Sequence, residues 1–340
     1  MRHPVRLGIA LTVVLATSAC SAAAGGSSQD HEPAATAAGR ATTLTSCGRQ
    51  LAFEGPPRRA VALDQASTEI LLELGLQERM AGTANLKTKI PAKYEAAYAK
   101  VPVIAPKIAT SEQVRSATPD FVVAGSADLY TKDRAGTREE LDAVKVPTFV
   151  SAVDCPLQNE PGKSAFDLLF ADYENLGKAF GADEPAHKLA AEQRAAVAAA
   201  GETAAKVKDQ PTVVYLYSVF NGMPYVAGKT GLPSEMSRIV GAKNAFDDVN
   251  EDWPEVSWEE VARRNPDFIV IGDLSERGRP GDSAAEKRDT MARHPVISKL
   301  DAVRTDKIIE VPGIELDPSV RSVHALELLA AGMRDLGHVR

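Results

Sequence analysis

An alanine-rich stretch spans residues 182–209, near the middle of the chain. Alanine has the highest helix propensity, and Pro185 stands early enough to be tolerated in a first turn. Glu184 near the start, and Lys206 and Lys208 near the end, complement the dipole of a helix. The stretch predicts one helix of roughly 25 residues, about 37 Å long, which can join two folded bodies. This linking helix could also begin earlier, in the helical stretch 164–180.

A short pattern recurs on the two sides of this helix. Residues 111–125, SEQVRSATPDFVVAG, and residues 258–272, WEEVARRNPDFIVIG, agree without a gap at Glu, Val, Pro, Asp, Phe, Val and Gly. Each copy is typical of a short helix, a Pro-Asp turn and a buried strand, a unit that is common in α/β proteins. The repeat predicts two Rossmann-like α/β lobes joined by one long helix, with a ligand cleft between them.

The amino terminus has the pattern of an export signal. Arg2 and Arg6 precede an apolar run over residues 7–16, which is too short to span a membrane, and small residues lead to Cys20. The pattern resembles the lipobox of bacterial lipoproteins, in which the cysteine is lipidated, although Thr17 stands where that motif usually has leucine. We expect lipidation of Cys20, with plain secretion as the alternative.

Composition divides the rest of the chain. After a signal over residues 1–20, small and polar residues over 21–45 are typical of a disordered tether. The remaining length suffices for two domains, predicted as an N-terminal lobe over 46–181, the linking helix and a C-terminal lobe over 210–340. A hydrophobic content of 44% fits a globular protein, and a net charge of −7 argues against nucleic acid as a partner.

Cysteine and histidine usage bears on covalent links and metals. Two cysteines remain after Cys20, namely Cys47 and Cys155. An even pair in an exported chain predicts a disulfide, and two buried thiols are the alternative. The histidines are scattered without the spacing of metal ligands, so we expect neither a bound metal ion nor a resident cofactor.

Polar and aromatic loops follow several predicted strands, and ligands of open α/β sheets bind at the carboxyl ends of strands. The candidate ligand-binding residues in these loops are Asp64, Gln65, Asn85, Tyr130, Phe220, Tyr225, Lys229, Trp253 and Arg321. Aromatic residues form only 5% of the chain, so their place in these loops favours a bulky, partly apolar ligand. Lys229 and Arg321 nearby favour an anionic one. Each residue could instead belong to a solvated loop or to the core of a lobe.

The order of these segments resembles a known family. The segments STEILLELGL, SEQVRSATPDFVVAG, the alanine-rich stretch, PYVAGKTGLPSEM, VSWEEVARRNPDFIVIG and AVRTDKIIEV follow one another as in the solute-binding proteins of iron-siderophore and cobalamin ABC importers. The resemblance covers residues 45–340. It implies two lobes joined by one long helix, modest closure on a ligand, and delivery of that ligand to a membrane permease.

The repeated helix starts carry predicted capping boxes. Thr110 and Ser257 stand at the N-cap positions, and Gln113 and Glu260 follow three residues later. In such a box, the side chains of both residues bond the free backbone N–H groups of the first turn.

Two glutamates beside these boxes, Glu112 and Glu259, should point into solvent. In the proteins that this chain resembles, a glutamate at the matching position of each lobe pairs with arginines of the permease. The resemblance therefore implies that Glu112 and Glu259 dock the permease. The alternative is that both only favour the positive end of a helix dipole.

The expected ligand is a ferric siderophore or a similar chelate. A second branch of the family, assigned to a deazaflavin cofactor precursor, looks similar around SCGRQ, AGTREELDAVKVPTFVSAVDC and VSWEEV. Cobalamin and haem are further alternatives. The expected partners are the permease, the small-molecule ligand and, through the lipid anchor, the outer face of the cytoplasmic membrane, with the protein itself a monomer.

Other classes of function fit less well. The chain has no G-x-S-x-G nucleophile elbow and no H-E-x-x-H zinc motif, so we do not expect an enzyme. A non-transport surface lipoprotein with an adhesive or structural role fits the tether and the anchor. It does not account for the repeat in the two predicted lobes.

Overall fold

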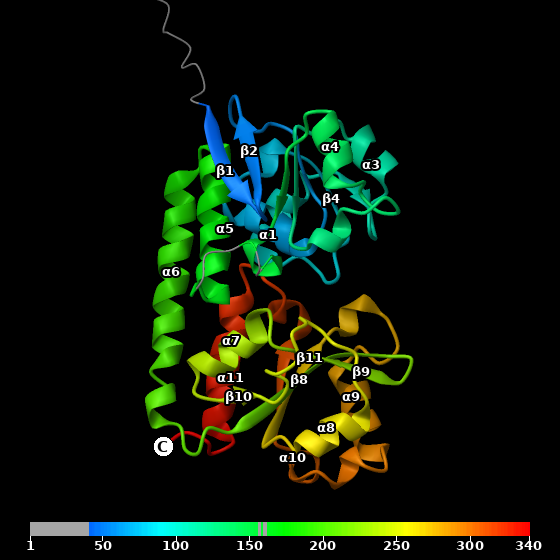
Figure 1. Cartoon of the computed structure of the whole chain (residues 1–340), viewed down its shortest axis with the longest axis vertical. Helices are drawn as coiled ribbons and strands as arrows, with labels where there is room; N and C mark the ends of the chain where they lie inside the picture. The colour runs from blue at the N-terminus through cyan, green and yellow to red at the C-terminus, as the bar shows by residue number, and fades with distance from the viewer. Residues whose placement is uncertain (1–40, 156–157, 159–161) are drawn as a thin grey trace, which may run out of the picture. The chain divides into compact units, whose positions relative to one another are not determined.

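A computed structural model describes residues 41–155, 158 and 162–340 (Figure 1). The predicted signal, Cys20 and most of the predicted tether lie outside the described residues. Strand β1 (Thr42–Ser46) begins within the last residues assigned to the tether. It pairs antiparallel with β2 (Arg49–Phe53), and alternate residues of both strands are buried, which is typical of a hairpin with one face on a core.

The N-terminal lobe contains a parallel sheet in the spatial order β5-β4-β3-β6-β7. Its strands are β3 (Ala60–Ala62), β4 (Met80–Ala84), β5 (Val103–Ala105), β6 (Phe121–Ala124) and β7 (Thr148–Val150). The helices of this lobe are α1 (Gln65–Glu73), α2 (Glu95–Tyr98), α3 (Ser111–Ser116) and α4 (Arg138–Ala143). Strands β3 and β6 are apolar and buried throughout, as expected for parallel strands covered on both faces.

The C-terminal lobe contains a second sheet in the order β10-β8-β11-β12, and β9 pairs antiparallel with β8. Its strands are β8 (Thr212–Phe220), β9 (Met223–Val226), β10 (Lys243–Asn244), β11 (Phe268–Asp273) and β12 (Ile308–Pro312). Its helices are α7 (Leu232–Ile239), α8 (Trp258–Arg264), α9 (Ala284–Arg293), α10 (Asp301–Arg304) and α11 (Ser322–Asp335). The prediction of two α/β lobes is confirmed.

The sequence repeat corresponds to equivalent positions in the two sheets. Its first copy forms α3 and β6, and β6 lies between β3 and β7. Its second copy forms α8 and β11, and β11 lies between β8 and β12. The shared Pro-Asp turn thus connects a surface helix to an internal strand in each lobe.

Two packed helices, rather than one, precede the C-terminal sheet. Helix α5 (Ala165–Phe180) ends at Gly181, whose φ of 68° is the left-handed conformation that glycine adopts at helix ends. Helix α6 (Asp183–Gly201) then packs against α5 and against α7 and α11 of the C-terminal lobe. The helix ends well before residue 209, because Gly201 is a poor helix former, and a 3₁₀ turn, η6 (Ala204–Lys206), follows.

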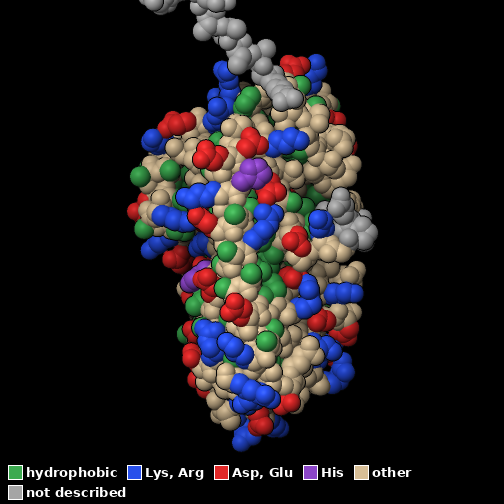
Figure 2. All heavy atoms as spheres, turned by 90° about the vertical axis from the view of Figure 1, so that its left-hand side faces the viewer, with side chains coloured by type: hydrophobic (Ala, Val, Ile, Leu, Met, Phe, Trp, Pro, Cys, Tyr) green, Lys and Arg blue, Asp and Glu red, His purple; other side chains and the backbone are tan. Residues whose placement is uncertain are grey.

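Close packing between α5 and α6 depends on Gly177. A Cβ atom at Gly177 would lie 2.4 Å from the Cβ of Ala186, so only glycine allows this approach. A buried hydrophobic cluster extends from Phe166 of α5 through Ala186 to Leu326 of α11. On the face shown in Figure 2, acidic and basic side chains of the described residues are interspersed.

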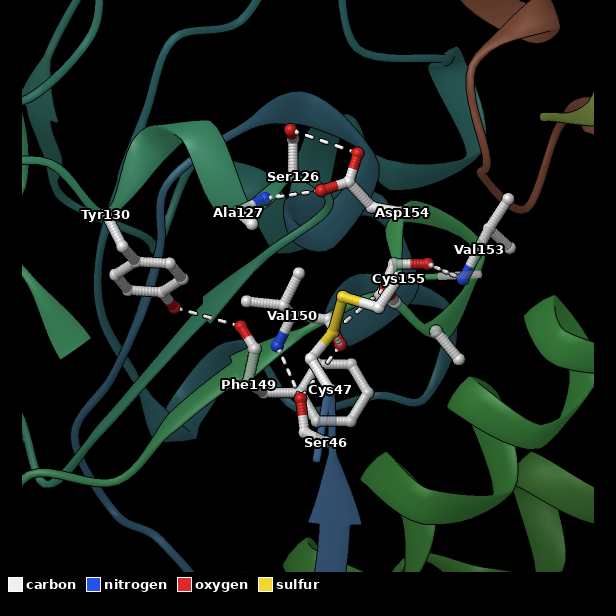
Figure 3. The surroundings of a disulfide bond; sticks show 12 residues. Ser46, Cys47, Ser126, Ala127, Tyr130, Phe149, Val150, Val153, Asp154 and Cys155 are labelled. Carbon is white, nitrogen blue, oxygen red and sulfur yellow. Dashed lines mark hydrogen bonds between the residues drawn. A yellow bond between two sulfur atoms is a disulfide. The ribbon is translucent and has the colours of Figure 1, made fainter. Parts of the chain in front are cut away.

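The predicted disulfide is present. Cys47, in the turn of the β1–β2 hairpin, bonds Cys155, with the two Cα atoms 5.5 Å apart (Figure 3). The hydroxyl of Ser46 donates to the carbonyl of Val150 at 2.9 Å and accepts from the Val150 N–H at 2.8 Å. The hairpin is thereby fixed, covalently and by hydrogen bonds, to the end of β7 and to the 3₁₀ turn η4 (Ala152–Asp154).

Candidate functional site

A pocket of about 270 Å³ opens in the C-terminal lobe, at the end of β8. Its aromatic lining consists of Tyr217, Phe220, Tyr225 and Trp253. The rings of Tyr217 and Trp253 are stacked with centroids 4.3 Å apart, and Phe220 is 55% exposed. Such a concentration of aromatic side chains, in a chain that has few, suits the apolar or conjugated face of a ligand.

The structure brings together Phe220, Tyr225 and Trp253 of the predicted set, and it adds Tyr217, which the sequence analysis missed. Tyr217 lies inside the continuous apolar run of β8, where a tyrosine is indistinguishable from a core residue. The described pocket is lined by the C-terminal lobe, whereas the prediction placed the ligand cleft between the lobes.

Two arginines line the pocket, and one of them is paired with a carboxylate of the same lining. Arg277, at the end of the 3₁₀ turn η7 (Ser275–Arg277), makes two hydrogen bonds to the Asp282 carboxylate, at 2.7 Å and 2.6 Å. Burial favours protonation of Asp282, but Arg277 outweighs it and lowers the pKa of this carboxyl below its ordinary value. Arg279 also lines the pocket and is exposed, and it has no ion-pair partner among the described residues.

A buried lysine, Lys287, holds backbone segments next to the pocket in place through hydrogen bonds. The ammonium group of Lys287 on α9 donates to the backbone carbonyls of Tyr217 at 2.6 Å, Gly272 at 2.5 Å and Asp282 at 2.8 Å. Burial lowers the pKa of Lys287 to about 8, so the group is still mostly protonated at neutral pH and has three hydrogens to donate. Lys287 therefore ties together the ends of β8 and β11 and the loop that carries Asp282.

The N-terminal lobe reaches the pocket wall through Lys87. Its ammonium group lies 2.7 Å from the Asp317 carboxylate and 3.2 Å from the Tyr217 hydroxyl. The same hydroxyl donates to Asp317 at 3.0 Å. Burial opposes the charge on Lys87, but Asp317 and Tyr217 outweigh it and raise the lysine pKa above its ordinary value.

Arg321, a predicted ligand-binding residue, is occupied by another contact between the lobes. Its guanidinium group makes two hydrogen bonds of 2.8 Å to the carboxylate of Glu69 on α1. The Glu69 side chain is 1% exposed, and Gln65 donates to it at 2.8 Å. In this structure Arg321 thus forms an ion pair that joins the lobes, and its role in ligand binding stays a prediction.

Asp64 and Gln65 also serve the local fold. The Asp64 carboxylate caps α1 by accepting the Ser67 N–H at 2.8 Å, and it accepts the Gly125 N–H at 2.6 Å. The amide oxygen of Gln65 accepts the N–H groups of Lys87 and Thr88, both at 2.9 Å. Both side chains are buried, so a ligand would have to break these bonds to use them.

Tyr130 is a core residue rather than a cleft residue. Its ring is buried, and its hydroxyl lies 2.9 Å from the carbonyl oxygens of Val122 and Phe149. Figure 3 shows the contact with Phe149. The sequence signal failed because a 3₁₀ turn, η3 (Ala127–Leu129), follows β6 and places the Tyr130 hydroxyl against backbone carbonyls of β6 and β7. Asn85, half-buried with φ 53°, and Lys229, exposed and outside the pocket lining, stay predictions.

The two glutamates predicted to contact a permease stand on matching helices. Glu112 and Glu259 lie in the first turns of α3 and α8, and both are exposed. The capping box of Thr110 is confirmed. The box at Ser257 is incomplete, because its hydroxyl accepts the Glu260 N–H while the Glu260 carboxylate pairs with arginines on α8 instead.

Two properties of the described residues bear on function class. No helix among them combines the length and the apolar character needed to cross a membrane. Within the same residues, no group of three or more His, Cys, Asp or Glu side chains is arranged to hold a metal ion.

Comparisons with known proteins agree on one family. The family model described as periplasmic binding protein matches residues 61–314. An uncharacterised ABC transporter substrate-binding lipoprotein of Bacillus subtilis is 25% identical over 276 residues, which cover 81% of this chain and 79% of the relative.

Two solved structures extend the comparison. A periplasmic binding protein from Veillonella parvula is 29% identical with a TM-score of 0.75, covering 87% of this chain and 98% of that one. A structure described as an ABC-type Fe³⁺-hydroxamate transport system from Saccharomonospora viridis is 25% identical with a TM-score of 0.71, covering 86% of this chain and 98% of that one.

Proposed function

Since this chain belongs to the periplasmic binding protein family, we propose that it binds a ferric siderophore or a similar chelate and delivers it to an ABC permease. It is a substrate-binding protein of the ABC-transporter type, as its Bacillus subtilis relative is named. The observation that carries the proposed ligand is the aromatic pocket with Arg279, which forms no ion pair among the described residues. Stacked rings and guanidinium groups suit an aromatic or conjugated ligand that bears negative charge.

The similarity to the Fe³⁺-hydroxamate protein supports a chelate as the ligand class. A deazaflavin cofactor precursor, cobalamin and haem are the alternative ligands, since each presents a large conjugated face. In this proposal the iron arrives within its chelate, and the protein needs no resident cofactor.

We predict that the ligand quenches the fluorescence of Trp253. Only two tryptophans occur in the chain, Trp253 in the pocket and Trp258 on α8, where the latter is buried and donates to the Gly222 carbonyl at 2.8 Å. Residues 21–340 would be titrated with ferric catecholates, ferric hydroxamates, haem, cobalamin and a deazaflavin precursor. We expect saturable quenching by one of them, with a Kd of about 1 μM or lower.

The control for this titration is Trp253→Phe, which should lose most of the quenching while a calorimetric titration still detects the ligand. A flat response of the wild-type protein to the whole panel, in fluorescence and calorimetry, would contradict the proposed ligand class. It would instead favour a non-transport surface lipoprotein, which binds no such molecule.

We also propose that the protein is exported and held at the outer face of the cytoplasmic membrane through lipidated Cys20, where it acts as a monomer. Cys20→Ala should shift the protein from the membrane fraction to the soluble extracytoplasmic fraction, because a single lipid-bearing residue supplies the anchor. Fractionation followed by immunoblotting measures this shift. Retention of Cys20→Ala in the membrane fraction would contradict lipid anchoring.

A further inference from the structure

Two cations flank the ring of Tyr217 in the wall of the pocket. The Lys87 ammonium nitrogen and the centre of the Arg277 guanidinium each lie 5.8 Å from the ring centroid. Lys87 comes from the N-terminal lobe and Arg277 from the C-terminal lobe. Each cation pairs with a carboxylate of the C-terminal lobe, Asp317 and Asp282 respectively. The two ion pairs differ in how firmly they are held.

The pair of Arg277 with Asp282 is locked. It has two parallel hydrogen bonds, and the Asp282 side chain is 2% exposed. A further hydrogen bond joins Arg277 to the Ser218 hydroxyl at 3.2 Å, and Lys287 holds the backbone carbonyl of Asp282. Both partners belong to one lobe, so a ligand would gain little by competing for this guanidinium group.

The pair of Lys87 with Asp317 is held more weakly. A single contact of 2.7 Å joins them, and their side chains are 30% and 18% exposed. An incoming anionic group therefore has to replace one direct contact rather than two, at side chains that are more exposed than those of Arg277 and Asp282. The pair also connects the two lobes, and its geometry therefore changes whenever the lobes move.

The second ion pair between the lobes, Glu69 with Arg321, resembles the locked pair instead. It has two hydrogen bonds of 2.8 Å, and its side chains are 1% and 17% exposed. Among these three pairs, Lys87 is the cation that an incoming group can capture most readily. It also contacts the hydroxyl of Tyr217, whose ring lines the pocket.

We propose that Lys87 is the cation that the N-terminal lobe contributes to ligand binding. Before the ligand binds, the Asp317 carboxylate pairs with Lys87, and an anionic group of the ligand replaces this carboxylate on binding. This inference rests on the proposed function, because it takes the pocket as the ligand site. The exchange favours anionic ligands, since a neutral ligand brings no negative charge to replace the Asp317 carboxylate as the partner of Lys87. Asp317 keeps the hydrogen bond from the Tyr217 hydroxyl after the exchange.

The test uses opposite changes at the two members of the pair. Wild type, Asp317→Asn, Lys87→Met and the double variant would be titrated calorimetrically with an anionic ferric tris-catecholate and with a charge-neutral ferric trihydroxamate. For the anionic chelate, Asp317→Asn should tighten binding about tenfold, because Lys87 is released, and Lys87→Met should weaken it about tenfold. The double variant should behave like Lys87→Met, and binding of the neutral chelate should hardly change.

Glu69→Gln is the matched control, because it weakens the other ion pair between the lobes, and the cation that it releases, Arg321, does not line the pocket. It should not tighten binding of the anionic chelate. Asp317→Ser provides a second release of Lys87, and thermal unfolding verifies that each variant is folded.

If the Lys87–Asp317 pair only joined the lobes and took no part in ligand binding, the calorimetric titrations would give a different result. If both Asp317→Asn and Lys87→Met change the affinity in the same direction, or if the neutral chelate responds as the anionic one does, the exchange is refuted while the proposed function stands. Failure of the wild-type protein to bind either chelate would overturn the proposed ligand class together with this inference.

Discussion

Replacement of both Cys47 and Cys155 by serine should lower the free energy of unfolding by about 2–5 kcal/mol. The disulfide closes a loop between residues that are 108 positions apart, so its loss greatly increases the freedom of the unfolded chain. In the native state, it also fixes the β1–β2 hairpin against η4. Chemical denaturation followed by circular dichroism measures the change.

Reducing agent supplies the matched control. Dithiothreitol should destabilise the wild-type protein by a similar amount and leave the Cys47→Ser/Cys155→Ser variant unaffected. Equal stability of the oxidised wild type and the double variant would show that the hydrogen bonds between Ser46 and Val150 hold the hairpin without covalent help.

The double variant Glu112→Ala/Glu259→Ala should lower ligand uptake by about 100-fold or more, if each lobe contacts the permease through its glutamate as the family resemblance implies. Its affinity for the ligand should stay within about twofold of wild type, since both side chains are exposed on helices α3 and α8, outside the pocket lining. Uptake of labelled ligand by cells that carry the cognate permease measures the first effect, and calorimetry the second.

Glu184→Ala/Glu192→Ala is the matched control for charge. These two glutamates are exposed on α6, and their removal changes the net charge equally. Uptake should remain normal in this control. Normal uptake by the Glu112/Glu259 variant would mean that these side chains serve only the dipoles of their helices.

The fold could be predicted because its signals are local and repeated. The Pro-Asp turn before two apolar strands identified both sheets, and an even cysteine pair in a chain with a predicted export signal identified the disulfide. The linking helix was predicted too long, since alanine propensity alone does not reveal that Gly201 ends it. Its partner α5 matches the helical stretch 164–180 recognised in the sequence, whereas the close packing of the two helices at Gly177 could not be predicted from local pattern.

The site was harder to predict because its members depend on partners that are distant in sequence. Arg321 is a plausible ligand contact by residue type, but Glu69, 252 positions away, occupies it. Tyr217 and Lys87 approach each other only after both lobes have formed, 130 positions apart. No local pattern distinguishes a free cation from a paired one, and this distinction decides which residues a ligand can use.

For a protein held by its amino end, as we propose here, the Cys47–Cys155 bond has a mechanical consequence. Tension on the tether enters the fold at Thr42 and acts first on the pairing of β1 with β2. Strand β1 can separate from β2 only as far as Cys47, because the disulfide to Cys155 then transmits the force to the segment that follows β7. The hairpin can therefore yield under a pull while both lobes, and the pocket, remain folded.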